Sequence, residues 1–173
     1  MTLRTACSVR PRTAADLPSC IGLLADVHHR DGYPVNWPAR PADWLASGDT
    51  VGSWVAELDG RVAGHVVLSR PGDDDLAARL WRERTGAEPA VVGRLFVSPA
   101  ARGHGVGAGL LRHVTAEARR LGRHPVLDVV ASDTAAIALY ERAGWRLLTT
   151  ATQCWSPGRT VTIHCYAGPV PAP

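Results

Sequence analysis

Apolar residues recur along the chain with two different periods, and these periods separate predicted helices from predicted strands. Where apolar residues return at every third or fourth position, they form one face of an amphipathic helix. Where they form short runs bounded by Gly, Pro, Asn or Asp, they are typical of strands. The spacing predicts helices over 14–29, 42–47, 74–84, 106–121 and between Asp133 and Gly144. It predicts strands over 8–10, 53–58, 61–69, 90–97, 126–130, 145–152 and 160–167.

The order of these elements predicts one domain with a mixed α/β sheet. Two early strands are joined by Asp59-Gly60, a pair typical of a tight β-hairpin. From residue 90 onward strands and helices alternate, which indicates a sheet flanked by helices. Asp73 can cap the helix over 74–84, and Gly86 can end it. No repeat marks a second domain, so we expect a single domain over 1–168 and a tail over 169–173.

Composition and charge narrow the class of protein. The chain has 173 residues, 46% of them hydrophobic, and a net charge of +3. Its positive charges are all arginines and form no run, which argues against a nucleic-acid-binding protein. The sequence has neither an apolar leader nor a long apolar stretch, so we expect a cytoplasmic protein without membrane contact.

Four cysteines, Cys7, Cys20, Cys154 and Cys165, form no C-x-x-C pair. We expect them to pack as small hydrophobic side chains rather than to bind a metal. Cys154 and Cys165 fall in the last two predicted strands, where they could face each other.

Glycines stand at 103, 105, 107 and 109, where a predicted strand gives way to a predicted helix. A glycine inside a helix destabilises it by about 1 kcal/mol relative to alanine, so bare backbone must serve a purpose here. The amides at a helix N-terminus are unpaired and favour an anion, and glycine lets a phosphate approach them. Arg102 adds a positive charge beside them. The alternative is a turn that only brings the helix close to the sheet.

Two nucleotide-binding motifs fit this segment less well. Gly103, Gly105 and Ala108 match G-x-G-x-x-A, but a dinucleotide-binding loop places its first glycine directly after the strand, and here 98–102 intervene. The lysine of a P-loop is missing.

Another motif fits the whole segment. Residues 102–107, RGHGVG, match Q/R-x-x-G-x-G/A, and through them the chain resembles the GNAT superfamily of N-acetyltransferases, whose acyl-coenzyme A motif this is. Residues 133–145, DTAAIALYERAGW, resemble the second signature of that family, although Asp133 stands where the family commonly has Asn. The resemblance covers about 91–148. It implies a mostly antiparallel twisted sheet with one splayed parallel strand pair, flanked by helices.

The resemblance also implies roles for individual residues. The donor would be acetyl-CoA, with no metal, and an amine would attack the thioester directly. Tyr140 would act as the general acid toward the leaving thiolate, although it could instead be a core aromatic residue. The implied cofactor contacts are Leu95, Phe96, Val97, Arg102, Gly103, His104, Gly105, Val106, Gly107, Ala108, Asp133 and Tyr140.

The general base has two candidates in the sequence. Many relatives carry an acid on the strand that contains Leu95, but this strand has none. Glu57 and His65 on the neighbouring hairpin are the remaining candidates, and a chain of water molecules is an alternative. The aromatic residues Tyr33, Trp37 and Trp44 could form the wall of the acceptor site or simply cover the core.

The expected function is therefore transfer of an acetyl group from acetyl-CoA to a primary amine of a small molecule or peptide. The alternatives are a non-catalytic acyl-CoA-binding module of the same fold and a dinucleotide-binding oxidoreductase. A homodimer is compatible with the resemblance. The Asp73-Asp74-Asp75 cluster could attract a cationic amine or serve only the helix that follows it.

Overall fold

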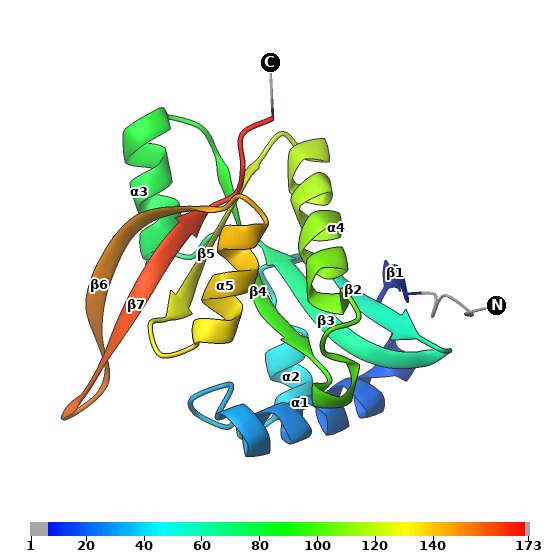
Figure 1. Ribbon diagram of the computed structural model, residues 1–173. Helices are drawn as coiled ribbons and strands as arrows, with labels where there is room; N and C mark the ends of the chain where they lie inside the picture. The colour runs from blue at the N-terminus through cyan, green and yellow to red at the C-terminus, as the bar shows by residue number, and fades with distance from the viewer. Residues whose placement is uncertain (1–6, 172–173) are drawn as a thin grey trace. The chain divides into compact units, whose positions relative to one another are not determined.

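The computed structural model describes residues 7–171 (Figure 1). These residues divide into two compact units. The first unit comprises 7–69 and 94–114, and the second comprises 70–93 and 115–171. Strand β4 (Pro89–Val97) and helix α4 (Val106–Arg120) each contribute residues to both units.

The first unit begins with a three-stranded antiparallel arrangement. Strand β2 (Thr50–Leu58) pairs with β1 (Cys7–Pro11) on one side and with β3 (Arg61–Ser69) on the other. The hairpin turns at Asp59 and Gly60, whose φ angles are 52° and 75°. Two successive positive φ angles are typical of a type I′ turn, as the Asp-Gly pair predicts.

Helix α1 (Leu17–Asp31) covers the core of this unit. It follows a short 3₁₀ turn, η1 (Ala14–Asp16), and precedes α2 (Pro41–Leu45). Gly32 ends α1 in the left-handed conformation at φ 73°, a common helix C-terminus. The apolar face of the helix packs in one buried cluster, whose members are Cys20, Leu23, Leu24, Val27, Leu45, Val55 and Phe96.

The second unit is built around an antiparallel set of strands and helix α3 (Leu76–Thr85). Strand β7 (Arg159–Ala167) pairs with β5 (His124–Val130) and with β6 (Arg146–Ser156). Ala77 and Ala78 of α3 pack in a buried cluster with residues of β5 and β7. Helix α5 (Thr134–Arg142) completes this unit.

Across residues 7–171 the hydrogen-bonded strand order is β1-β2-β3-β4-β5-β7-β6. The pair β4–β5 is parallel, and its register joins Pro89 to His124, Ala90 to Pro125 and Val91 to Val126. The register extends over only three residues of each strand, which agrees with a splayed pair. The expected mixed sheet with one parallel pair among antiparallel strands is confirmed.

Two local predictions are wrong. Asp75, not Asp73, is the N-cap residue of α3, and its carboxylate accepts the Gly72 N–H over 2.6 Å. The strand register also keeps Cys154 and Cys165 apart, because Cys154 lies opposite Thr160 and Cys165 opposite Thr149. The described cysteines are all free, as expected, although Cys7 and Cys154 are exposed rather than packed inside.

Candidate functional site

The glycine-rich segment forms a turn between two helical pieces. The 3₁₀ turn η2 (Pro99–Ala101) precedes it, and α4 begins at Val106. Gly103 and Gly105 have φ angles of 80° and 76°, a region that disfavours other L-residues. These two glycines are therefore required by the backbone conformation of the turn.

The amides of this segment are available to a ligand. Of the backbone hydrogen bonds outside regular elements in residues 7–171, none starts from an amide between Gly103 and Ala108. A Cβ atom added at Gly103, Gly105 or Gly109 would meet no atom within 4 Å. The N-terminus of α4 thus presents unpaired donors beside open space, which is the arrangement that binds a phosphate.

The close approach of helix to sheet occurs elsewhere. A Cβ atom at Gly64 of β3 would lie 2.8 Å from Leu110 Cδ1 and 2.9 Å from Val106 Cγ1. Gly64 therefore lets the first turns of α4 rest on β3. Packing against the sheet explains Gly64, but it does not explain the glycines of the turn.

Arg102 forms an ion pair at the end of helix α1. Its Nη2 contacts Asp31 Oδ2, and its Nη1 donates to Asp31 Oδ1 over 3.3 Å. The hydrogen bond from Arg102 lowers the pKa of Asp31 below its ordinary value. Both side chains keep part of their surface exposed, so Arg102 can still meet an anion at the turn.

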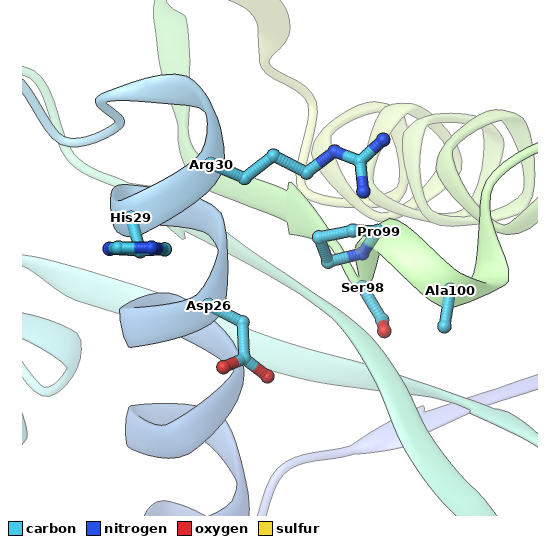
Figure 2. A pocket seen from close by; sticks show the side chains of 6 residues that line it. All are labelled: Asp26, His29, Arg30, Ser98, Pro99 and Ala100. Carbon is cyan, nitrogen blue, oxygen red and sulfur yellow. The ribbon is translucent and has the colours of Figure 1, made fainter.

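A pocket of about 360 Å³ lies between α1 and the residues just before the turn. Figure 2 shows Arg30 reaching from α1 toward Pro99, with His29 directly before it and Asp26 about one turn earlier in the same helix. Ser98 and Ala100 form the opposite side. The pocket is thus lined by polar and charged side chains of α1 on one side and, on the other, by the segment that precedes the glycine turn.

Strand β4 is irregular at Arg94, which has a φ of 50°. A non-glycine residue at positive φ is uncommon, and such strain persists where the surroundings hold it. The Arg94 carbonyl accepts a hydrogen bond from Nδ1–H of His65 over 2.9 Å. The irregularity lies directly before Leu95, Phe96 and Val97. It therefore determines the direction of the backbone segment that is expected to contact the acyl group.

His65 is fully buried and both of its ring nitrogens are engaged. With Nδ1–H donating to Arg94, we assign the neutral tautomer in which Nε2 accepts from Arg12 Nη1 over 2.9 Å. Burial lowers the pKa of His65 to about 4, and the nearby charges of Arg12 and Arg94 add to this effect. The imidazole therefore holds no free lone pair for a substrate proton.

Glu57 belongs to a separate ion-pair network. Its Oε1 accepts from Arg10 Nη2 over 2.7 Å, and Arg10 also contacts Asp16 over 2.8 Å. Arg10 holds the pKa of Asp16 well below its usual range. Glu57 thus forms an ion pair with Arg10 of β1, and the charge of its carboxylate is balanced by this arginine.

The second unit holds the two residues of the second signature. Asp133 caps α5, because its Oδ1 accepts the Ala136 N–H over 3.0 Å. Tyr140 is 6% exposed, and its ring lies 6.0 Å from that of Trp145 and 6.1 Å from that of Tyr166. Tyr140 is therefore a buried aromatic residue of the second unit that also occupies the tyrosine position of the signature.

Asp128 of β5 is an acid that the sequence reasoning missed. Desolvation, followed by the charge of Asp75, raises the pKa of Asp128 above its ordinary value, although the residue is exposed. It lies opposite Cys165 in the strand register, on the face that packs against α3. A carboxylate with a raised pKa in an accessible position is a candidate proton acceptor. The available signal was a lone acid between Leu127 and Val129 in an otherwise apolar strand.

The proposed acceptor wall of the first unit is partly ordered by aromatic packing. Tyr33 and Trp44 pack against the core cluster, whereas Trp37 is 41% exposed. His28 Nδ1 donates to the Pro34 carbonyl over 2.8 Å, and its ring lies 5.2 Å from that of Trp37. Tyr33 and Trp44 thus cover the core, and the expected wall is only partly made of free aromatic surface.

The family model described as the Acetyltransferase (GNAT) family matches residues 23–145. The chain belongs to this family. It is therefore an acyltransferase, and the donor that GNAT enzymes use, acetyl-CoA, agrees with the sequence expectation. This match decides against the dinucleotide-binding oxidoreductase.

Solved structures show that this GNAT chain has the fold of its family. The ribosomal-protein-alanine N-acetyltransferase of Brucella melitensis is 23% identical with a TM-score of 0.70, over 94% of this chain and 99% of that one. Arabidopsis thaliana NAA60 in complex with acetyl-CoA is 20% identical with a TM-score of 0.68, over 94% and 98%. A GNAT-family acetyltransferase of Streptococcus pneumoniae is 16% identical with a TM-score of 0.68, also over 94% and 98%. The search of curated proteins gave no significant match.

Two further properties of this GNAT chain concern residues 7–171 alone. No helix in that range is long and apolar enough to cross a membrane. Nor does the same range bring three or more His, Cys, Asp or Glu side chains together as metal ligands.

Proposed function

We propose that this enzyme transfers the acetyl group of acetyl-CoA directly to a primary amine of a small molecule or a peptide. The observation that carries the proposal is the open set of amides between Gly103 and Ala108 at the start of α4. These donors fit the diphosphate of coenzyme A, with Arg102 and His104 at their edge.

The donor's acyl end would meet the backbone of β4. Leu95, Phe96 and Val97 are proposed to pair with the pantetheine arm and to donate to the acetyl carbonyl. Backbone N–H groups aimed at the oxygen that becomes negative stabilise the transition state of acyl transfer. The strained residue Arg94, fixed by His65, holds this part of the strand in place.

Chemistry then follows from two proton transfers. The neutral amine attacks the carbonyl carbon of the thioester, a C–N bond forms, and the C–S bond breaks. Tyr140 is proposed to give its phenolic proton to the leaving thiolate, while Asp133 at the cap of the same helix contacts the donor. The attacking nitrogen, which becomes positively charged, must lose a proton to a base.

We assign that base to Asp128 rather than to Glu57 or His65. Glu57 is ion-paired with Arg10, and both ring nitrogens of His65 are engaged. Asp128 has a carboxylate that is accessible and whose pKa is raised. A base with a pKa closer to the working pH accepts a proton more effectively in catalysis.

The names of the structural neighbours make both acceptor classes reasonable. The Brucella protein is named for the alanine of a ribosomal protein, and another neighbour is described as a phosphinothricin N-acetyltransferase. Peptide amines and small-molecule amines therefore both belong in an acceptor screen.

The test is a thiol-release assay with acetyl-CoA and a panel of amines, together with calorimetry of coenzyme A binding. We expect micromolar to millimolar coenzyme A affinity and thiol release that depends on the amine. Binding without release for any amine would support the acyl-CoA-binding module, and no binding at all would overturn the proposal.

The role of Tyr140 needs its own variant. Tyr140→Phe keeps the buried ring but removes the hydroxyl, so kcat should fall about 10²-fold or more while coenzyme A affinity is kept. Unchanged turnover would remove Tyr140 from the chemistry.

A further inference from the structure

Arg94 has a guanidinium without a hydrogen-bond acceptor among residues 7–171. Its Nε is buried and has no hydrogen-bond partner, and its side chain forms no ion pair within the described residues. Three other arginines of the first unit are engaged: Arg10 with two carboxylates, Arg12 with the Leu45 carbonyl and His65, and Arg102 with Asp31. Arg12 has no carboxylate partner either, but its guanidinium donates to a carbonyl and an imidazole, whereas the buried Nε of Arg94 has no acceptor.

Aromatic side chains hold Arg94 in a defined place. Its guanidinium carbon lies over the Trp44 ring, 4.9 Å from the centroid. The Trp44 ring lies 6.4 Å from that of Tyr33, which in turn lies 6.5 Å from that of Phe96. A guanidinium stacked on an indole face keeps its N–H groups pointing outward in its own plane, where they can meet an acceptor.

The charge of Arg94 is poorly compensated by its surroundings. Desolvation lowers the pKa of Arg94 and is the largest effect; Tyr33 opposes it, and the positive charge of Arg12 adds a smaller lowering effect. A partly buried cation without an anion is unfavourable. Because the residue is only partly buried, a ligand can supply that anion.

The position of Arg94 links this missing anion to the acceptor. Arg94 precedes Leu95, which our proposed function places at the acyl group, and it stacks on Trp44, which packs against the core cluster beside it. A group bound to Arg94 would therefore lie next to the place where the amine must attack.

We propose that Arg94 binds a carboxylate of the acceptor, so that the preferred substrates are amines that carry an acid group, such as amino acids. A single free guanidinium matches the single charge and planar shape of a carboxylate better than a phosphate, which carries nearly two charges. This inference rests on the proposed function and names the substrate class for it.

The first test compares matched acceptors with the wild-type enzyme. Amino acids and their carboxamides differ only in the carboxylate that Arg94 would bind. The amine of a carboxamide has the lower pKa, so more of it is neutral and able to attack the thioester. We nevertheless expect kcat/KM to be at least about 10-fold higher for the acids, because hydrogen bonds to a charged group are strong. Equal values, or a preference for carboxamides or for phosphate-bearing amines, would overturn the inference.

The second test replaces the arginine. Arg94→Gln should raise KM for the acids about 10- to 100-fold and leave the carboxamides unchanged, while Arg94→Lys should restore part of the preference. Arg61→Gln, at an exposed arginine of the hairpin, is the matched control and should keep the wild-type preference. A preference that survives in Arg94→Gln would also overturn the inference.

A binding measurement separates recognition from chemistry. Hydroxy acids with the same carboxylate cannot be N-acetylated, and calorimetry in the presence of coenzyme A should detect their binding to the wild-type enzyme but not to Arg94→Gln. If carboxamides and acids are acetylated equally, only this inference fails. If no amine releases thiol, the proposed function fails first.

Discussion

Nδ1–H of His65 donates to the carbonyl oxygen of Arg94 over 2.9 Å, at the residue where β4 adopts a φ of 50°. A buried imidazole thus holds a strained strand residue that a regular ladder would not hold. Because Nε2 accepts from Arg12, the ring is needed in its neutral form. Protonation would break the contact with Arg12 and place two cations side by side.

This relationship predicts a pH-dependent stability. The folded pKa of His65 is about 4, below the ordinary value of 6.5, so the unfolded chain takes up the proton first as the pH falls. Stability should be full above pH 6.5 and should decline by about 3 kcal/mol toward pH 4. Denaturant unfolding at several pH values measures this decline.

His65→Gln should remove most of that slope, although it lowers stability at neutral pH. His29→Gln, at an exposed histidine of α1, should keep the slope. An identical slope in the wild type and in His65→Gln would show that other groups cause the pH dependence.

The glycines of the turn should differ in their effects on coenzyme A binding. Gly105 has a φ of 76°, so alanine there strains the backbone by about 1 kcal/mol or more and shifts the amides that follow it. We expect Gly105→Ala to weaken coenzyme A binding about 10-fold. Gly109→Ala, inside α4 with open space at its Cβ, should leave affinity nearly unchanged and raise thermal stability. Calorimetry and thermal unfolding of both variants check this contrast, and equal affinity losses would contradict it.

Local sequence signals were sufficient to predict the turns and helix ends that need a positive φ angle. The Asp59-Gly60 turn, the end of α3 at Gly86 and the glycine turn before α4 all require positive φ angles, and glycine marks them. Short runs of apolar residues predicted all seven strands found in residues 7–171, because a strand of a covered sheet buries its apolar side chains.

The remaining features depend on tertiary contacts that no local pattern encodes. Three consecutive aspartates all suit a helix N-terminus, so the pattern could not select Asp75 as the cap. Arg94 adopts a conformation that usually indicates glycine, and it is held there by tertiary contacts with His65 and Trp44. The pKa of Asp128 is raised by desolvation and, to a smaller extent, by the charge of Asp75, which lies 53 positions away in the chain.

The contact between β3 and α4 predicts a stability effect at Gly64. An added methyl group would lie 2.8 Å from Leu110 and 2.9 Å from Val106, so α4 would have to move away from the sheet. We expect Gly64→Ala to lower the free energy of unfolding by about 1–3 kcal/mol, as overpacking does. It should also weaken coenzyme A binding, because Val106 begins the helix.

Gly22→Ala is the matched control for Gly64→Ala. Gly22 lies within α1, and a Cβ atom there meets nothing within 4 Å. The same change should therefore stabilise the protein by up to about 1 kcal/mol through helix propensity. Denaturant unfolding compares the two, and a Gly64→Ala variant as stable as the wild type would show that α4 adapts without strain.

The assignment of Asp128 as base predicts the acidic limb of the pH–rate profile. The carboxylate must be deprotonated to accept the proton, so activity falls as the pH drops through a pKa that lies above the ordinary value for aspartate. Asp128→Asn should abolish this limb and reduce kcat about 10²-fold or more, with little change in coenzyme A affinity. An unaltered profile in Asp128→Asn would exclude it as the base.

Asp75→Asn tests the electrostatic contribution to the raised pKa of Asp128, which is smaller than the contribution of desolvation. The negative charge of Asp75 raises the pKa of Asp128, so removing it should move the acidic limb to lower pH while an asparagine oxygen still accepts from Gly72. Asp73→Asn removes an exposed charge from the same cluster and should leave the limb in place. If Asp75 only supports helix α3, Asp75→Asn will change stability or kcat and leave the acidic limb in place. A displacement of the limb to lower pH shows instead that the charge of Asp75 raises the pKa of the base.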